Sequence, residues 1–335
     1  MKFRSFEDLA ETVRANLHRV PHDIDVVVGV PRSGMFPAGM IALYRNASLT
    51  DLDGFFEGRV LQHGIRREKP GIRATPDLWR NVLVVDDSLG TGGTMANVRA
   101  RFAAAGGHWK VSYCAIYGVE VLHPDVDLIF EVCPLPRVFE WNLMHHPYSL
   151  ERACIDIDGL LCVDPTPDEN DDGPRYERFL REARPFHLPT VPVATLVSSR
   201  LEKHRVQTED WLGRHGVQYG ELCLLDLPSA AERRRLKAHI PFKAEVYRNK
   251  KDAWLFLESE REQAQAIAAR TAKAVICTSD MILFDETGAH RTVRMVRRKI
   301  GESRRYLSRL RARLQRSLSN TDKAVSMVRR QTTDN

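Results

Sequence analysis

Short apolar runs alternate with amphipathic stretches in the first part of the chain, and this alternation predicts strands that are each followed by a helix. Unbroken apolar runs of strand length are typical of parallel strands covered on both faces, whereas apolar residues three and four apart are typical of helices. On these patterns we expect strands at residues 24–30, 82–85, 110–118 and 128–132, a strand and turn around residues 47–54, and helices at residues 35–44 and 94–105.

The same alternation returns in the second part of the chain. Strands are expected around residues 153–161, 196–200 and 253–258, and helices at residues 175–183, at 202–215 and near Phe242. Because 335 residues exceed the usual size of one compact domain, the sequence predicts two. The expected fold class is α/β, with two doubly wound parallel-sheet domains at residues 1–150 and 151–286 and a basic amphipathic helical tail at residues 287–335.

The composition is that of a globular protein and lacks the marks of a membrane or secreted one. Hydrophobic residues make up 43% of the chain and aromatic residues 8%, which is ample for two cores. No apolar run approaches the length of a membrane span, and the first residues form an amphipathic helix and not a signal peptide. The six cysteines show no CxxC pairing and lie in or beside apolar runs, so we expect reduced core thiols and a cytoplasmic location.

The positive charge of the chain is concentrated in the tail. The net charge is +6, yet residues 291–330 carry 14 Lys and Arg against two acidic residues, so the rest of the chain is acidic. Three interpretations stay open: a peripheral helix on the anionic inner face of a membrane, a coiled coil that forms a homo-oligomer, or a helix packed on the acidic body of the protein. The apolar stripe of this helix consists of Val293, Val296, Ile300, Leu307, Leu310 and Leu314.

Residues 82–95, which read VLVVDDSLGTGGTM, are the most informative segment. A buried strand leads into Asp86 and Asp87, which could accept hydrogen bonds from the diol of a ribose. A loop of small and hydroxyl residues follows and opens a helix, which is a setting for a phosphate monoester. The loop lacks the lysine of a nucleoside-triphosphate P-loop. The less specific alternative is an ordinary Rossmann-like strand, loop and helix.

This segment resembles the phosphoribosyl pyrophosphate (PRPP) signature of the type I phosphoribosyltransferases. Residues 26–34, which read VVVGVPRSG, resemble the pyrophosphate-binding turn of the same family. The resemblance implies that Asp86 and Asp87 hold the ribose diol, and that a turn after the first strand holds pyrophosphate and its Mg²⁺. The implied 5-phosphate ligands are Ser88, Gly90, Thr91, Gly92, Gly93 and Thr94. The implied pyrophosphate ligands are Pro31, Arg32, Ser33 and Gly34.

Two further segments of the first domain have less certain roles. Residues 58–76 occupy the place of the family's flexible hood loop, and they are either a clamp for leaving pyrophosphate or a solvated basic loop. The clamp residues would be Arg66, Arg67, Lys69 and Arg73. Residues 134–148 close the domain, and their aromatic and histidine side chains either line an acceptor pocket or pack between domains, with packing favoured. These side chains are Phe139, Trp141, His145 and His146.

A second chemical motif follows at once. Residues 153–161 read ACIDIDGLL, an apolar strand that leads into Asp156 and Asp158. Two carboxylates one residue apart can share a divalent cation and divide the work, the first attacking phosphorus and the second transferring protons. Because calcium loops also use DxDG, this motif alone is weak.

Its context resembles the haloacid dehalogenase-like phosphatases, in which the strand ends and helix starts carry Asp-x-Asp, Ser, Lys and an acid in this order. The resemblance implies Asp156 as nucleophile, Asp158 as general acid and base, and Ser198 as phosphoryl ligand. It implies Lys243 as the neutralising cation, and a Mg²⁺ site formed by Asp156, Asp158 and Glu258. The family usually shows adjacent acids at the last motif, whereas this chain reads Glu258-Ser259-Glu260. Glu260 is therefore an alternative ligand, and Lys250 and Lys251 are alternative lysines.

The spacing between these motifs leaves no room for a full cap domain. The site is therefore expected either to be open to a large or membrane-bound substrate or to be capped by the neighbouring domain. A transferase that adds phosphoribosyl and a phosphatase that removes its phosphate would together deliver bare ribofuranose. This pairing resembles the phosphoribosyltransferase–phosphatase enzymes of bacterial surface polysaccharide synthesis, and it implies PRPP as donor and a lipid-linked glycan as acceptor. Two alternatives stay open, namely nucleobase salvage with a fused nucleotidase, and a PRPP-sensing regulator. The regulator would bind nucleic acid through the tail, and the complete phosphatase set argues against it.

Overall fold

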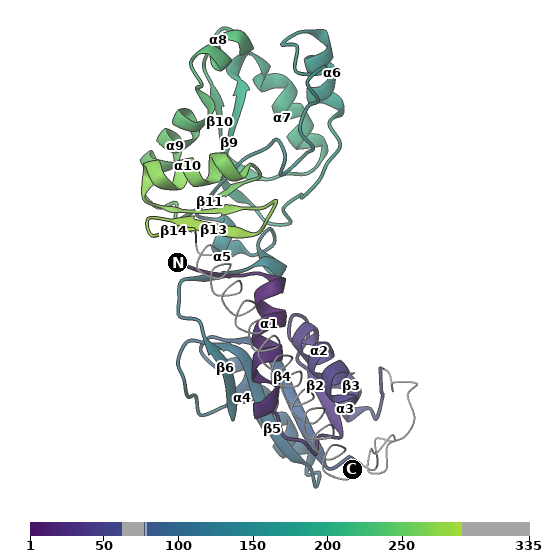
Figure 1. Ribbon diagram of the computed structural model, residues 1–335. Helices are drawn as coiled ribbons and strands as arrows, with labels where there is room; N and C mark the ends of the chain where they lie inside the picture. Colours follow the sequence, from purple (N-terminus) through teal and green to yellow (C-terminus); the bar gives the residue numbers. More distant parts are fainter. Residues whose placement is uncertain (62–76, 78, 290–335) are drawn as a thin grey trace, which may run out of the picture. The chain divides into compact units, whose positions relative to one another are not determined.

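The computed structural model describes residues 1–61, 77 and 79–289, and it divides into two compact units (Figure 1). Unit 1 is Met1–Ser149 and unit 2 is Leu150–Asn335. The proposed hood residues Arg66, Arg67, Lys69 and Arg73 lie outside the described residues, as does nearly all of the basic tail.

Unit 1 is built on a five-stranded sheet in which every pair of neighbours is parallel. The register aligns Gly29 with Val85, and Val85 with Cys114. The strand order is β3 (Ser48–Asp51), β2 (Val26–Gly29), β4 (Asn81–Leu89), β5 (Lys110–Gly118) and β6 (Leu128–Val132). A separate parallel pair joins β1 (Lys2–Arg4) to β7 (Arg137–Phe139), which leads into η3 (Glu140–Asn142).

Helices cover both faces of this sheet, because successive residues of a buried strand point to opposite sides. Val27 and Val85 face a core that includes Leu9 of α1 (Phe6–Asn16) and Ile41 of α2 (Met35–Arg45). The alternate residues, such as Val84, face Phe55 of α3 (Leu52–Phe56) and Met95 of α4 (Gly93–Ala105). The α/β architecture with a parallel sheet, which the sequence predicts, is confirmed for this unit.

Two elements of unit 1 differ from the sequence-based expectation. Strand β4 does not end at Val85 but continues to Leu89, so both aspartates lie within it, and Asp86 pairs with Ala115 of β5. The backbone ladder does not require apolar side chains, and an apolar run therefore understates the strand. Residues 52–56, expected as a turn, form a helix because the Asp51 side chain caps it by accepting the Gly54 N–H.

Unit 2 contains a seven-stranded sheet that is parallel except at one edge. Its order is β10 (Tyr219–Leu225), β9 (Val193–Leu201), β8 (Ala153–Ile155), β11 (Leu255–Glu258), β12 (Ala274–Cys277), β13 (Ile282–Asp285) and β14 (Gly288–Ala289). β13 and β14 run antiparallel to their neighbours. The sheet is thus mixed and not wholly parallel as expected.

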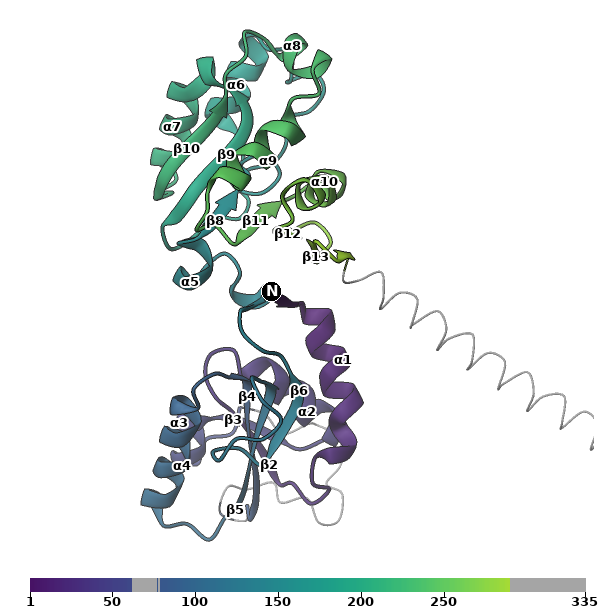
Figure 2. The same cartoon turned by 90° about the vertical axis from the view of Figure 1, so that its left-hand side faces the viewer.

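Helices lie on both sides of this sheet as well, with α6 (Pro174–Glu182) and α7 (Arg205–Arg214) opposite α9 (His239–Asn249) and α10 (Arg261–Thr271) (Figure 2). The α9–α10 side packs Tyr247 and Ile267 onto Phe256. The remaining short helices of the described chain are η1 (Leu17–Arg19), α5 (Pro147–Leu150), η4 (Glu202–His204) and α8 (Ala230–Arg235).

All six cysteines are free, and five of them are buried. Among the described residues, no helix is both long enough and apolar enough to cross a bilayer.

Candidate active sites

Two loops of unit 1 begin at adjacent strand ends. β2 and β4 are neighbours in the sheet, and the chain winds outward from this pair in both directions. Ligands of open α/β sheets bind at such a switch point, beyond the carboxyl ends of the strands. The Val30 N–H donates to the Val85 carbonyl at 2.9 Å, which fixes the turn after β2 against β4. The two segments singled out in the sequence therefore meet in space.

The loop after β4 encloses a small polar pocket at the start of α4. The pocket has a volume of about 170 Å³ and is lined by Asp86 and residues 88–94. Gly92 has a φ of +84°, and a Cβ atom there would lie 2.2 Å from the His123 ring, so glycine is required on both counts. Thr91, Gly93 and Thr94 are exposed. Free backbone N–H groups at a helix start and nearby hydroxyls can bind a phosphate group.

Gly34 joins the two loops by direct backbone contact. A Cβ atom at Gly34 would lie 2.5 Å from the Val30 carbonyl oxygen and 2.7 Å from that of Val85. No side chain fits in this space, because both obstacles are backbone atoms. The turn can therefore approach Asp86 closely only with glycine at this position.

Asp87 is held by a side chain from each of two other segments. The Ser33 hydroxyl donates to Oδ1 at 2.8 Å, and the Trp141 indole N–H donates to Oδ2 at 2.8 Å. Trp141 stacks on Phe139 with ring centroids 4.7 Å apart, and more loosely on Tyr117. Phe139 and Trp141 thus pack within unit 1, where Trp141 positions a carboxylate of the signature. His145 and His146 are exposed.

Fewer hydrogen-bond donors contact the Asp86 carboxyl group than contact that of Asp87. Burial raises the pKa of Asp86 to about 8, and the adjacent Asp87 charge adds to this effect. Burial beside Asp87 therefore favours the protonated form of the Asp86 carboxyl group. A bound hydroxyl pair or a cation would offset the crowding of these two acids.

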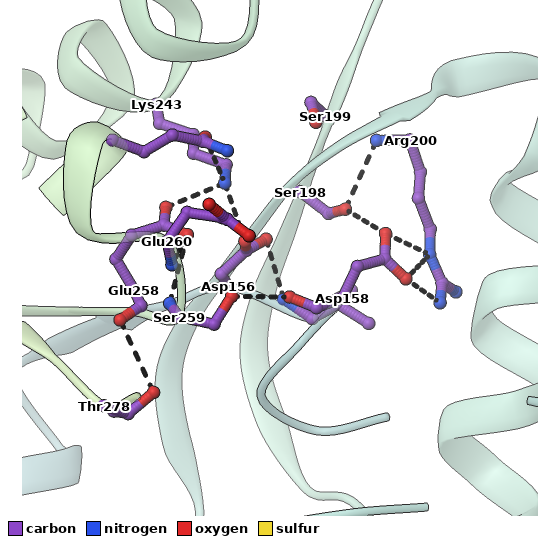
Figure 3. Close-up of polar contacts among 12 residues, drawn as sticks. Asp156, Asp158, Ser198, Ser199, Arg200, Lys243, Glu258, Ser259, Glu260 and Thr278 are labelled. Atoms are coloured by element: carbon purple, nitrogen blue, oxygen red, sulfur yellow. Dashed lines mark hydrogen bonds and ion pairs between the residues drawn. The ribbon is translucent and has the colours of Figure 1, made fainter. Parts of the chain in front are cut away.

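In unit 2, a buried lysine joins the two motifs that are most distant in sequence. Lys243 on α9 donates to Asp156 Oδ2 at 2.6 Å, to Glu258 Oε2 at 2.8 Å and to Gln263 Oε1 at 3.0 Å (Figure 3). Lys243 is 2% exposed, Asp156 4% and Glu258 0%. Burial lowers the pKa of Lys243, but Asp156 and Glu258 outweigh burial and raise it, so the amine stays charged.

Asp158 lies on the other side of Asp156 and is paired with Arg200 (Figure 3). The guanidinium Nη2 lies 2.7 Å from Oδ1, and the Ser198 hydroxyl lies 3.5 Å from Oδ2. Burial pushes the pKa of Asp158 upward, but the charge and hydrogen bonds of Arg200 outweigh it and hold the pKa below its usual value. Asp156 differs, because burial raises its pKa and Glu258 and Asp158 add to the rise.

The donor chemistry of this cluster suits a hard cation. Three carboxylates, Asp156, Asp158 and Glu258, face two cations, Lys243 and Arg200, so the site holds an excess of carboxylate oxygen of the kind that Mg²⁺ prefers. Within the described chain, however, no three His, Cys, Asp or Glu side chains already stand in the geometry of a metal centre. Both Asp158 oxygens accept from Arg200, so this side chain would have to give up a bond to bind metal.

The side chains of the alternative site residues are not buried in the cluster. Lys250 forms an ion pair with Glu221, and Lys251 is exposed. The Glu260 side chain is exposed, whereas its backbone N–H donates to Glu258 Oε1 at 3.2 Å. The geometry therefore favours Lys243 and Glu258.

The local backbone explains why position 159 of the DxDG motif is a glycine. Its φ is +75°, and a Cβ atom would lie 2.3 Å from Ser259 Oγ. The glycine thus lets the Asp-x-Asp turn pass close to the segment that carries Glu258.

Sequence reasoning missed two residues of this cluster, Arg200 and Gln263. Arg200 is fully buried, yet on the sequence it is one of 50 basic residues. Its position two residues after Ser198 on a strand was a usable signal, because such residues share a face.

The N-terminal part of the chain is similar to solved structures of phosphoribosyltransferases. A purine phosphoribosyltransferase from Pyrococcus horikoshii is 17% identical, with a TM-score of 0.30, over 42% of this chain and 92% of that one. The Helicobacter pylori xanthine-guanine-hypoxanthine phosphoribosyltransferase is 16% identical, with a TM-score of 0.32, over the same shares. No protein-family model and no curated protein matches the chain.

Proposed function

We propose that the chain is a two-step enzyme that transfers 5-phosphoribosyl from PRPP to an acceptor and then removes the 5-phosphate. The observation that carries the proposal is the Asp156–Lys243–Glu258 cluster, because a buried nucleophile with its own cation belongs to a reaction and not to simple binding. Unit 1 adds a phosphate-sized pocket beside Asp86. A transferase that leaves a phosphate on its product gives such a phosphatase a substrate.

In the first step the acceptor hydroxyl oxygen would bond to C1 of the ribose while the bond from C1 to pyrophosphate breaks. Asp86 and Asp87 would hold the ribose diol, and the loop of residues 88–94 would hold the 5-phosphate. The turn at Pro31, Arg32, Ser33 and Gly34 would hold the leaving pyrophosphate with Mg²⁺. This step needs no protein nucleophile, so orientation and charge stabilisation supply the rate.

In the second step unit 2 would act as a haloacid dehalogenase-like phosphatase. An Asp156 oxygen would bond to phosphorus while the bond from phosphorus to the ribose O5 breaks, and Asp158 would give that oxygen a proton. Water would then cleave the aspartyl phosphate as Asp158 takes its proton. Ser198 and Lys243 would bind the phosphoryl oxygens.

A Mg²⁺ ion in unit 2 would be held by Asp156, Asp158 and Glu258. When bound, it would neutralise charge on the phosphoryl group. The excess of carboxylates over cations in the cluster supports this assignment.

The proposed acceptor is a lipid-linked glycan, so that the product is a ribofuranosyl residue for surface polysaccharide. Residues 159–192, between the Asp-x-Asp motif and β9, contain one helix, α6, and a segment of this size cannot form a separate cap. A phosphatase domain without a cap of its own suits a phosphate presented on a large molecule.

The test is an Asp156→Asn comparison in the full-length protein, supplied with PRPP and a lipid-linked glycan, with the products read by mass spectrometry. We expect phosphoribosyl adduct to accumulate in the variant and ribosyl adduct in the parent protein. An Asp87→Asn variant, expected to form neither, is the matched control for unit 1. If PRPP were consumed with a free nucleobase and not with the glycan, the protein would be a salvage enzyme with a nucleotidase.

A further inference from the structure

We propose that Arg200 is a positioning residue of the phosphatase site, which orients Asp158 as the base that activates water in the second half of the reaction. This inference rests on the proposed function of unit 2. The inference is carried by the ion pair between the Arg200 guanidinium and the Asp158 carboxylate, next to Asp156 (Figure 3).

The strand geometry directs Arg200 at Asp158. Ser198 and Arg200 are two residues apart on β9 and therefore project from the same face. Both contact Asp158, which follows the neighbouring strand β8. β9 thus presents a phosphoryl ligand and a cation to the same carboxylate.

The Arg200 guanidinium cannot reach a substrate. Its side chain is 0% exposed, whereas the Asp158 side chain keeps 19% of its surface exposed. Because Arg200 is wholly buried and its shortest contact is with Asp158, any effect of Arg200 on the reaction passes through Asp158. Thr208 and Cys162 enclose the guanidinium, with contacts of 3.4 Å to Oγ1 and 3.2 Å to Sγ.

The contacts distinguish the two oxygens of Asp158. Oδ1 accepts from Nε at 3.2 Å and Nη2 at 2.7 Å, and Cys162 Sγ lies 3.5 Å away. Oδ2 accepts from Nε at 3.1 Å and has Ser198 Oγ at 3.5 Å. Oδ1 is therefore the more firmly anchored oxygen, and Oδ2 has the longer contacts, which a water molecule can replace. Since guanidinium has donors and no acceptor, the pairing holds Asp158 in the ionised form that a base requires.

A buried ion pair is weak support for stability, because desolvating two charges offsets most of their attraction. A pair that only held unit 2 together could be replaced by apolar side chains. A positioning role predicts instead that the two half-reactions respond differently when Arg200 changes. The first half-reaction needs no proton when the leaving group is nitrophenolate, whereas the hydrolysis of aspartyl phosphate always needs a base.

The experiment follows p-nitrophenyl phosphate turnover in full-length Arg200→Lys, which keeps the charge and loses the planar fork. We expect turnover to fall about 100-fold, the usual contribution of a positioned base. We also expect a burst of nitrophenol of up to one equivalent, with phosphate trapped on the protein after acid quench. Adding Arg200→Lys to Asp158→Asn should cost nothing further, because Arg200 acts through Asp158.

The control is Tyr247→Phe, which removes a buried hydrogen bond of 2.8 Å to the Ala274 carbonyl at the start of β12. It should lower the unfolding temperature of unit 2 without producing a burst. If Arg200→Lys lost turnover with no burst and no trapped phosphate, in proportion to its unfolding temperature, Arg200 would be structural and the inference wrong. Full turnover in Asp156→Asn would instead overturn the phosphatase proposal, and this inference with it.

Discussion

The two candidate sites are built from different chemical groups. The pocket of unit 1 is lined by glycine backbone, hydroxyl groups and Asp86, and its loop is largely exposed. The cluster of unit 2 is made of carboxylates and cations that are almost wholly buried. A group that needs only to be held can be bound by backbone N–H donors at the start of a helix. A carboxylate that attacks phosphorus, the role proposed for Asp156, works best where protein groups replace water around its charge.

The two sites also differ in how the negative charge of each pair of aspartates is offset. Asp86 and Asp87 crowd each other, and Asp87 is satisfied by the neutral donors of Ser33 and Trp141. Asp156 and Asp158 each have a cation of their own, Lys243 and Arg200. Unit 1 therefore depends on its ligands to relieve the crowding, whereas unit 2 contains its counter-charges.

The largest effect that would sharpen this contrast is expected from Lys243→Met. The change leaves Asp156 and Glu258 buried without their shared cation, which should cost unit 2 about 3–5 kcal/mol. Turnover of p-nitrophenyl phosphate should fall by at least about 1,000-fold. Amide hydrogen exchange of unit 2 peptides measures the stability, and absorbance measures the turnover.

The control is Lys250→Met, which breaks the exposed pair with Glu221. It should change stability by less than about 1 kcal/mol and leave turnover unchanged. Equal losses in the two variants would mean that burial does not identify the working lysine.

A smaller effect is expected from Gly34→Ala in unit 1. The added methyl group would meet the carbonyl oxygens of Val30 and Val85 at 2.5 and 2.7 Å, and the forced shift should cost about 1–3 kcal/mol. PRPP affinity, measured by calorimetry, should fall while p-nitrophenyl phosphate turnover in unit 2 is unchanged.

Gly39→Ala on α2 is the matched change, since its Cβ atom would meet Leu49 Cδ2 at 3.9 Å and nothing closer. It should stabilise the helix by about 0.5–1 kcal/mol and leave PRPP affinity as it was. A Gly34→Ala protein with normal PRPP affinity would show that the backbone contact is dispensable.

A change in pH dependence is expected from Asp86→Asn. The native Asp86 pKa of about 8 lies above the ordinary value of 3.8, so between these pH values the folded state keeps a proton that the unfolded chain has released. The contribution of this group to the free energy of unfolding therefore falls as pH rises from about 4 to about 8. The variant lacks this loss, so its stability relative to the parent protein should be greater at pH 8.5 than at pH 4.5.

Hydrogen exchange of β4 and β5 peptides at the two pH values measures this difference in unit 1 alone. A variant that differed from the parent protein by the same amount at both values would contradict the assignment of the raised pKa to Asp86.

The sequence predicts those parts of the sites whose chemistry is local. The glycine loop, the acid pairs and their flanking strands are consecutive in the chain, and each follows an apolar run that can be recognised. The antiparallel edge at β13 and β14 is different, because the pairing of short strands depends on neighbours in space.

The sequence also could not predict which side chains from distant segments contact the site residues. Trp141 reaches Asp87 across 54 positions, and Arg200 reaches Asp158 across 42. A side chain's partner at such a separation is decided by how strands are ordered in a sheet, which no local pattern contains. The length of β4 was underestimated for a related reason, since its last residues are held by pairing with β5 and not by apolar character.

The contact at Gly34 also limits how this fold can be recombined. The turn after β2 and the backbone of β4 touch without an intervening side chain. No side-chain rearrangement can therefore adapt either segment to a partner with a different backbone position. A chimera that took one of these loops from a different protein would inherit a mismatch of backbone positions that no side-chain change could repair. The two loops should therefore be exchanged together or not at all, although 50 residues separate Gly34 from Val85 in the chain.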